Sequence, residues 1–365
     1  MRWMRRCALA FVWTIACGDA SSGEDSGAAT ENATATSASS GTPSTTNDPT
    51  TGPTTSMTTQ NESSVTSDDP TGEATGEEGS SSTTDLPDDV EVIELRAGGF
   101  TPPLGETFYS CFSFTFEVDK LHHIIGFQPV VTNPLIHHYV LSIADGEVQR
   151  DPNDPCFEWP ASILWAWAPG IEDTMLPPEA GFLIGDAEGG QHTFILQVHY
   201  NDPLQQGITD NDGIDVLITP TLRPNAAGIL SQGDIYTISI PPGQEAYPHV
   251  ATCGEALTQG LLSHEINVFA SFLHAHEIGA ALTTEVFRDD MLVGSIVQDP
   301  FDFNMQTFQP TDVTIAPGDR ITTTCVYDST GRASQTGGGV ASDEEMCINF
   351  LMYYPAVAAE KCGAL

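Results

Sequence analysis

The sequence predicts an all-β protein in which residues 90–365 form two tandem sandwich or jelly-roll domains. This region contains many short runs rich in β-branched and aromatic residues, which fit a pleated, half-buried surface. Turn sequences such as PPG, RDD and APGD separate these runs, and no long stretch has helical periodicity. The length of the region suits two sandwich domains.

The expected strands alternate with turns along the whole region. In chain order they are 136–145 (IHHYVLSIAD), 194–202 (FILQVHYND), 213–222 (GIDVLITPTL), 235–243 (IYTISIPPG), 266–273 (INVFASFL), 281–289 (ALTTEVFRD) and 320–328 (RITTTCVYD). We expect the N-terminal domain to span residues 90–211 and the C-terminal domain residues 212–365.

The first 17 residues predict an export signal. MRWMRRCALAFVWTIAC combines basic residues with an apolar run of about ten residues, which is too short to span a bilayer. The end of residues 1–17, Thr14-Ile15-Ala16-Cys17, resembles a bacterial lipobox. We therefore expect Cys17 to be lipidated and to anchor the protein at the bacterial outer membrane or the cell surface. Thr14 departs from the usual Leu, so conventional signal cleavage remains the alternative.

Residues 18–89 have the composition of a disordered tether. They are rich in Ser, Thr, Gly, Pro, Asp and Glu, and no Lys or Arg occurs between Arg6 and Arg96. Low hydrophobicity and charge of one sign do not offset the entropy of ordering a chain. The whole chain has 50 acidic and 11 basic residues and a formal charge of −39, which excludes a nucleic-acid partner.

The cysteines predict disulfides rather than a thiolate metal site. Of the eight cysteines, Cys7 and Cys17 fall in the export signal, which leaves Cys111, Cys156, Cys253, Cys325, Cys347 and Cys362. An even number in an exported chain indicates disulfides, although spacing alone leaves the pairing open. None of the six forms a CxxC or CxH zinc pattern.

Five histidines lie in or beside apolar strand-like runs, in three groups. His137 and His138 share one run, His199 lies in a second, and His274 and His276 lie in SFLHAHEIG. Buried imidazoles need partners, and a metal is one such partner, because His is the commonest ligand of zinc and copper. Taken alone, the pair His274–His276 is more typical of a half-buried strand than of a metal site.

Two features bear on how these histidines could bind metal. Adjacent His137 and His138 would point to opposite faces of a regular strand, so binding one metal requires a twist or bulge, or different ring nitrogens. Met346, beside Cys347 at the start of an apolar strand, could complete the second set, because a thioether favours Cu(I). The alternative for Met346 is a core methionine.

Five ordered motifs carry a family resemblance: LHHIIGFQPVV, NPLIHHYVL, QVHYNDPL, SFLHAHEIG and DEEMCINFLMYYP. Together with residues 163–170 (ILWAWAPG), residues 176–185 (LPPEAGFLIG) and Cys362, they resemble the copper type II, ascorbate-dependent monooxygenases. That family includes dopamine β-monooxygenase and peptidylglycine α-hydroxylating monooxygenase. The resemblance covers roughly residues 95–365, and it implies two jelly-roll-like domains that each hold one copper.

The resemblance also implies roles for individual residues. The residues that match the ligands of the first copper are His137, His138 and His199. The residues that match the ligands of the second copper are His274, His276 and Met346. The second copper would activate O2 and hydroxylate an aliphatic C–H bond, and the first would store an electron supplied by ascorbate or a similar reductant. The implied disulfides are Cys111–Cys156, Cys253–Cys362 and Cys325–Cys347. His122 and His123 match a position that does not bind copper, and His192, His249 and His264 are expected on the surface or in loops.

Departures from the peptide-hydroxylating branch indicate the substrate class. Where that branch has Arg, Asn and Tyr, this chain has Phe272, Ile348 and Phe350, so a peptide carboxylate would be left unpaired. We expect a small apolar or aromatic substrate. Gln197 either lines the cleft or is an ordinary polar strand residue. The alternative function is a non-catalytic copper-binding or copper-storage lipoprotein. A zinc protein is disfavoured, because no glutamate general base or cysteine set accompanies the histidines.

Overall fold

A computed structural model describes residues 87–104, 107–156, 162–202 and 204–365. The expected export signal with Cys17, and nearly all of the expected tether, lie outside these residues. The regular elements of the described residues are all strands except for one short helix, α1 (Glu255–Leu261), which confirms the all-β prediction. In this part of the chain, no helix has the length and apolarity needed to cross a membrane.

The first half of the fold is a sandwich of two sheets. Its strands are β1 (Glu91–Arg96), β2 (Thr107–Val118), β3 (His122–Val130), β4 (Ile136–Asp145), β5 (Ser162–Trp167), β6 (Thr174–Met175), β7 (Ala180–Ile184), β8 (Gly190–Asn201) and β9 (Gly213–Thr219). One sheet has the order β2-β8-β4-β5, and the other contains β1-β9-β3-β7. Rings from the two sheets meet in the core, where Phe127 of β3 stacks on Trp165 of β5 with centroids 5.4 Å apart.

The second half contains the remaining strands. They are β10 (Asn225–Asp234), β11 (Ser239–Ile240), β12 (Tyr247–Cys253), β13 (Ile266–His274), β14 (Gly279–Arg288), β15 (Met291–Gln298), β16 (Gln309–Ile315), β17 (Arg320–Tyr327), β18 (Thr336–Gly337), β19 (Cys347–Tyr354) and β20 (Lys361–Ala364). Strands β10-β19-β13-β16 form one layer and β12-β17-β14-β15 the other, while β11 and β18 form a separate pair. Core side chains of this half, such as Leu351 of β19 and Ile321 of β17, come from both layers.

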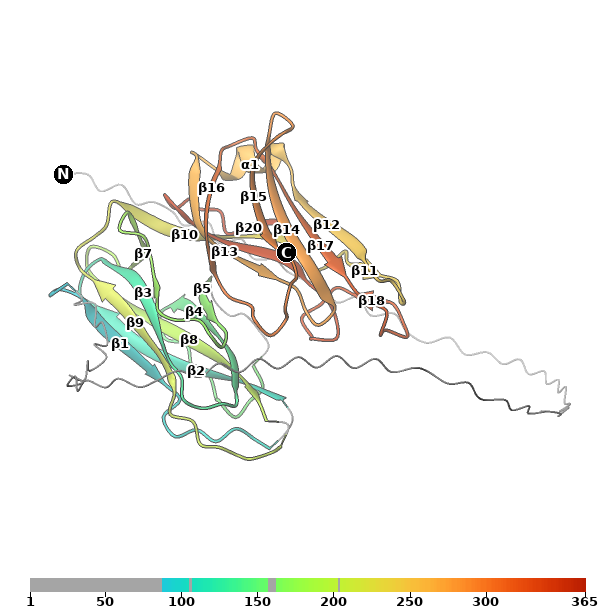
Figure 1. The fold of residues 1–365 in the computed structure, drawn as a ribbon. Helices are drawn as coiled ribbons and strands as arrows, with labels where there is room; N and C mark the ends of the chain where they lie inside the picture. The colour runs from blue at the N-terminus through green and yellow to red at the C-terminus, as the bar shows by residue number, and fades with distance from the viewer. Residues whose placement is uncertain (1–86, 105–106, 157–161, 203) are drawn as a thin grey trace, which may run out of the picture. The chain divides into compact units, whose positions relative to one another are not determined.

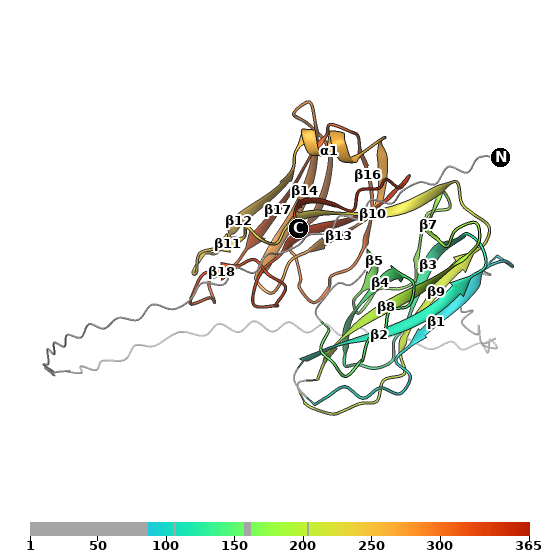
Figure 2. The same cartoon turned by 180° about the vertical axis from the view of Figure 1, so that it is seen from behind.

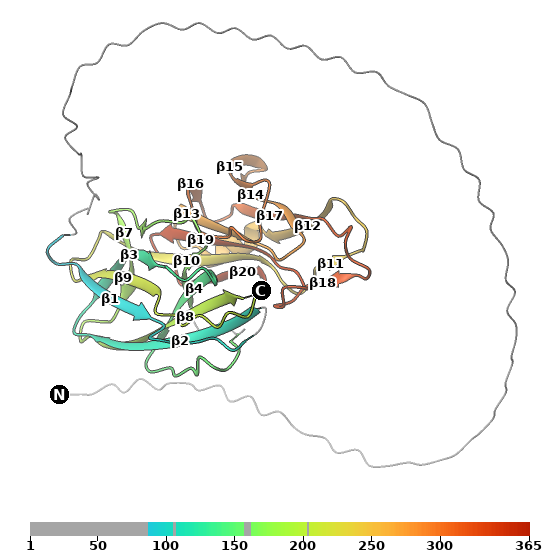
Figure 3. The same ribbon diagram turned by 60° about the horizontal axis from the view of Figure 1, so that its bottom comes forward.

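A parallel pairing of β7 with β10 makes one sheet continuous between the halves. Figures 1 and 2 show β10, in yellow, between the strands of the first half and those of the second. Figure 3 shows β10 beside β19 and β13, in agreement with their pairing. Arg223, just before β10, fastens this junction by donating from Nη1 to the carbonyl oxygens of Leu176, Pro177 and Ala180.

The three disulfides have the pairing that the resemblance implies: Cys111–Cys156, Cys253–Cys362 and Cys325–Cys347. The first links β2 to the segment after β4. The second joins β12 to β20, and the third joins β17 to the first residue of β19. The last of these fixes the chain immediately after Met346.

The structure departs from the expected elements in two places. Residues 235–238 are not a strand, because the Asp234 carboxylate accepts hydrogen bonds from the backbone N–H groups of Tyr236 and Thr237 and bends the chain. In addition, β9 pairs with β1 and β3, although the expected boundary between residues 211 and 212 assigns it to the second domain. Because β9 pairs with a strand of the first half on each side, the first sandwich extends to residue 219.

Candidate metal centres

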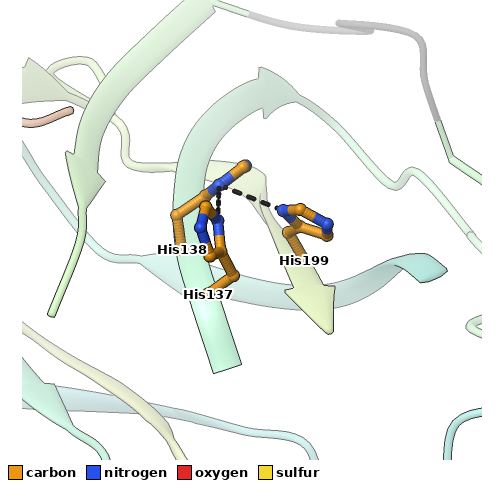
Figure 4. A group of neighbouring side chains, drawn as sticks. All are labelled: His137, His138 and His199. Carbon is orange, nitrogen blue, oxygen red and sulfur yellow. Dashed lines mark hydrogen bonds between the residues drawn. The ribbon is translucent and has the colours of Figure 1, made fainter. Parts of the chain in front are cut away.

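Three imidazoles converge at one end of the first sandwich. His137 and His138 lie on β4 and His199 lies on the neighbouring strand β8, and Figure 4 shows their rings turned toward one another. The Nδ1 atom of His138 lies 3.2 Å from Nδ1 of His137 and 3.3 Å from Nδ1 of His199. Ligand atoms of all three lie within 4.8 Å of one another, a spacing that one metal ion can bridge.

A β-bulge explains how two adjacent histidines reach the same point. In the pairing of β4 with β8, Ile136 faces Tyr200 and His138 faces His199, so His137 is an extra residue without a partner of its own. A bulge bends the strand and redirects the side chain of the inserted residue. Of the options that the sequence left open, a twist, a bulge or different ring nitrogens, the structure contains the bulge, at His137.

The outer ring nitrogens of His137 and His199 have hydrogen-bond partners outside the cluster. His137 Nε2 lies 2.8 Å from Asn304 Oδ1, and His199 Nε2 lies 2.5 Å from Thr107 Oγ1. Tyr109 stacks on the His199 ring, with centroids 4.2 Å apart. A bond at one nitrogen orients the ring and leaves the other nitrogen to a metal, so this set offers Nδ1 atoms.

The surroundings keep His138 and His199 neutral, as a metal ligand must be. Burial lowers the pKa of His199 to about 3, with a further contribution from the neighbouring His137. Burial, together with the neighbouring His199, His137 and His274, holds the pKa of His138 well below its usual value. Neutral rings keep a lone pair available for coordination at ordinary pH.

The second histidine set lies where β13 ends. His274 is the last residue of β13 and His276 follows it, with ring centroids 5.2 Å apart. His274 Nδ1 lies 2.6 Å from Gln306 Oε1, and His276 Nδ1 lies 3.1 Å from the carbonyl oxygen of Glu344. The bonded nitrogens are thus Nδ1 in this set, which leaves the Nε2 atoms to a metal. Burial, aided by His276, lowers the pKa of His274 to about 3.

Met346 lies immediately before β19 and is almost fully buried. It belongs to an apolar cluster that also contains Phe272, Ile348 and Phe350. Its carbonyl oxygen accepts a hydrogen bond of 2.7 Å from the Tyr327 hydroxyl, and the next residue is held by the Cys325–Cys347 disulfide. The backbone of Met346 is therefore fixed on both sides.

A buried carboxylate connects Met346 to the histidine pair, and sequence reasoning missed it. Glu345 is fully buried and accepts hydrogen bonds from the backbone N–H groups of His276 (2.8 Å), Ile278 (2.9 Å) and Met346 (3.3 Å). Burial raises its pKa to about 7, although the three donors oppose this shift. Only the acidic DEEM sequence beside Met346 hinted at such a role. The carboxylate holds the segments of His276 and Met346 together.

Glu345→Gln is expected to lower the free energy of unfolding of the metal-free protein by about 1–3 kcal/mol. The amide nitrogen of Gln cannot accept a hydrogen bond, so at least one of the buried backbone N–H groups that Glu345 binds would lose its partner. It should also weaken metal retention by the second set. Denaturant unfolding at pH 8, where the carboxylate is ionised, and metal analysis after dialysis measure both effects. Glu344→Gln is the matched control, since an amide oxygen can still accept from Ala341 N–H. Equal stability and metal content in the two variants would contradict this role.

Other residues singled out in the sequence lie outside these sets. His122 Nδ1 bonds the Lys120 carbonyl oxygen and His123 Nδ1 accepts from Arg223 N–H, in line with the structural roles expected of them. Gln197 is buried and donates to the Cys156 carbonyl oxygen, so it supports the backbone beside a disulfide rather than lining a cleft.

The expectation of surface or loop positions for the last three histidines was wrong for two of them. His192 is buried on β8, where its Nε2 accepts from Gly185 N–H. His249 lies on β12 and its Nε2 is 3.0 Å from the Asp234 carboxylate. His264 alone lies in a connection between elements, as expected. Single-residue context did not reveal these partners, because they lie in other segments.

The two sets have the chemistry of copper ligands. The first offers three imidazole nitrogens, and the second offers two imidazoles, with the Met346 thioether on a segment that Glu345 joins to His276. Imidazole suits both copper oxidation states, and a thioether favours Cu(I) over zinc or magnesium. The convergence of three imidazoles, with His138 and His199 kept neutral, fits such an ion at the first set.

Comparison with known proteins agrees with this chemistry. Residues 93–207 match the N-terminal domain, and residues 225–364 the C-terminal domain, of copper type II ascorbate-dependent monooxygenases. Tyramine beta-hydroxylase of Caenorhabditis briggsae is 35% identical over 307 residues, which cover 78% of this chain and 52% of that protein. Dopamine beta-hydroxylase of Rattus norvegicus is 33% identical, with 77% of this chain and 48% of that protein covered. DBH-like monooxygenase protein 1 of Gallus gallus is 32% identical, with 76% and 49% covered.

The chain thus spans about half the length of these relatives. Both family domains are matched in order, and together they contain all six residues of the two candidate ligand sets. The chain therefore belongs to the copper type II ascorbate-dependent monooxygenase family.

Proposed function

We propose that this protein is a copper monooxygenase that hydroxylates an aliphatic C–H bond of a small apolar or aromatic substrate, using O2 and ascorbate or a similar one-electron reductant. The observation that carries the proposal is the presence of two separate histidine sets, in which His137, His199, His274 and His276 each have one ring nitrogen hydrogen-bonded to a residue outside the set. Membership of an ascorbate-dependent copper family supports the same conclusion.

In this proposal the two sets hold one copper each. The ligands are, at the first site, His137, His138 and His199 and, at the second, His274, His276 and Met346. Copper would supply one-electron redox chemistry at both sites and oxygen activation at the second. The chain orients the rings through their outer nitrogens, and Glu345 holds the second set together.

The side chains beside His274 favour an apolar substrate. Phe272 lies with its ring centroid 5.6 Å from that of His274 and 5.4 Å from that of Phe350. Phe308 packs on Phe272 at 5.4 Å, and Ile348 belongs to the same buried cluster. These apolar side chains offer no hydrogen-bond or charged partner to a carboxylate, whereas they stabilise a hydrocarbon or aryl group by burial and ring packing.

The proposal is tested by oxygen uptake with ascorbate, copper-loaded protein and matched pairs of compounds. Phenethyl-type compounds should give product in proportion to oxygen consumed, and peptides ending in a carboxylate should not. The parallel assay with zinc-loaded protein should give no uptake. Tight binding of copper without product from any compound would reject the enzyme and support the copper-storage alternative.

We also propose that Cys17 anchors the protein to a membrane, as the lipobox-like TIAC sequence suggests. Three disulfides are typical of exported proteins, which supports passage out of the cytoplasm. Cys17→Ser is expected to move the protein from the membrane fraction to the soluble fraction, because the acceptor of the lipid is removed. Cell fractionation and mass spectrometry of the mature N-terminus measure this, and an unlipidated mature N-terminus in the unsubstituted protein would reject the anchor.

A further inference from the structure

One short segment of the second half contacts both histidine sets. It lies between β15 and β16 and runs from Asp302 to Gln306. Its Asn304 side chain reaches His137 of the first set, and its Gln306 side chain reaches His274 of the second. Between them, the Phe303 ring lies 6.3 Å from the His137 ring and 6.5 Å from the His276 ring, measured between centroids.

The orientation of the Asn304 amide follows from its neighbours. The Asp302 carboxylate oxygen Oδ1 lies 2.9 Å from Asn304 N and 3.2 Å from Asn304 Nδ2. A carboxylate oxygen accepts hydrogen bonds, so the amide nitrogen faces Asp302 and the amide oxygen faces His137. An amide oxygen also only accepts, and His137 must therefore carry its proton on Nε2, with Nδ1 free.

The same reasoning orients the Gln306 amide, whose oxygen also faces a histidine but contacts the other kind of ring nitrogen. Gln306 Nε2 donates to the Phe303 carbonyl oxygen at 2.8 Å, which leaves Oε1 to face His274 Nδ1 at 2.6 Å. His274 must then carry its proton on Nδ1, with Nε2 free. Two amides, two residues apart, thus select opposite ring nitrogens.

The segment is held in place on both flanks. Phe301 N–H donates to the Ala280 carbonyl oxygen at 2.8 Å, and Met305 N–H donates to the Asp302 carbonyl oxygen at 3.0 Å. Thr307, just after the segment, is buried and donates at 3.1 Å to the carbonyl oxygen of Ala166, on β5 of the first half. The two amide oxygens are therefore presented by fixed backbone.

We propose that the segment Asp302–Gln306 is a shared positioning element that sets which ring nitrogen of His137 and of His274 faces the metal. This rests on the proposed function, in which both rings hold copper. Groups that orient a ligand from its outer nitrogen typically change metal affinity by roughly 10–100-fold when they are removed. Asn304 and Gln306 act through the imidazoles and not on the substrate.

The test reads the ring protons directly in metal-free protein. With histidine ring nitrogens labelled with ¹⁵N, long-range ¹⁵N–¹H spectra should show His137 protonated on Nε2 and His274 protonated on Nδ1. Asn304→Leu should convert His137 to a mixture of both forms and leave His274 unchanged, and Gln306→Leu should do the reverse. Met305→Leu, between the two amides, is the matched control and should change neither ring.

A charge-conserving swap provides the rescue. Asp302→Asn combined with Asn304→Asp exchanges donor and acceptor within their hydrogen bond. The double variant still presents an oxygen to His137, so His137 should have the Nε2–H form that Asn304→Leu loses. In copper-loaded protein, pulsed EPR of the remote ring nitrogen should change at the first site for Asn304→Leu and at the second for Gln306→Leu, with copper dissociation faster by roughly tenfold.

Two results would overturn the proposal: a proton on Nδ1 of His137 in the unsubstituted protein, or unchanged ring forms in both leucine variants. These results concern metal-free protein, so they are independent of oxygen uptake. The positioning role can therefore fail while the monooxygenase proposal stands. Conversely, copper-loaded protein that shows no coupled oxygen uptake would reject the monooxygenase proposal, and the ring protons of the metal-free protein could still be as expected.

Discussion

Met346→Ile is expected to lower oxygen-coupled hydroxylation by orders of magnitude while the melting temperature barely changes. Met346 is 4% exposed within an apolar cluster, and a swap that conserves volume in such a core costs less than about 1.5 kcal/mol. The backbone is unaltered, so its carbonyl oxygen still accepts from the Tyr327 hydroxyl. The substitution removes the thioether, and with it the preference of the second site for Cu(I).

Met352→Ile is the matched control for this experiment. Met352 is fully buried on β19, the strand that follows Met346, and belongs to the same apolar cluster, but it is no candidate ligand. Both variants should have similar unfolding curves, and only Met346→Ile should lose activity and Cu(I) retention. Met346→His adds a nitrogen ligand that should bind Cu(II) and disfavour Cu(I). Full copper content and full coupled turnover in Met346→Ile would make Met346 a core methionine, the alternative open from the sequence.

His199→Ala is expected to remove one of two coppers and to leave the other in place. The first set depends on His199, which lies on a different strand from its other two members. The second set uses none of these residues, so its affinity should change little. Metal analysis of copper-saturated protein and EPR of the remaining Cu(II) measure the outcome. His192→Ala, also buried on β8, is the control and should retain both coppers.

His199→Ala should also alter the acid stability of the metal-free protein. The pKa of His199 is lowered to about 3 in the folded state from 6.5, so between these values the unfolded chain takes up a proton that the folded chain does not. Stability therefore falls as pH decreases through this window, by at most about 1.4 kcal/mol per pH unit for this group. His199→Ala should reduce that slope. A variant with two coppers and an unchanged acid slope would contradict both expectations.

Strand periodicity predicts well which residues share a face, and for that reason the histidine sets could be found from the sequence. The runs around His199 and His274 read as strands, and the adjacency of His137 and His138 made a bulge one of the options, which the structure contains. The disulfide pairing followed from the resemblance, not from spacing. Local patterns thus singled out the histidine groups, and the resemblance made them candidate ligands.

The residues that contact the candidate ligands from other segments could not be found from strand periodicity. Glu345 accepts from His276 N–H, 69 residues away in the sequence, and Asn304 reaches His137 across 167 residues. No periodicity links such positions, and each residue is ordinary in its own segment. Likewise, residues 235–240 have strand composition, yet the Asp234 side chain competes for the backbone and bends most of the run.

The parallel ladder between β7 and β10 makes each half dependent on the other for solubility. Three residue pairs, from Asn225↔Ala180 to Ala227↔Phe182, close this ladder. A cut in residues 220–224 would leave β7 and the first residues of β10 as open sheet edges, whose free N–H and C=O groups invite pairing with other chains. Fragments produced separately should therefore aggregate, and the intact chain should unfold in one cooperative transition rather than two.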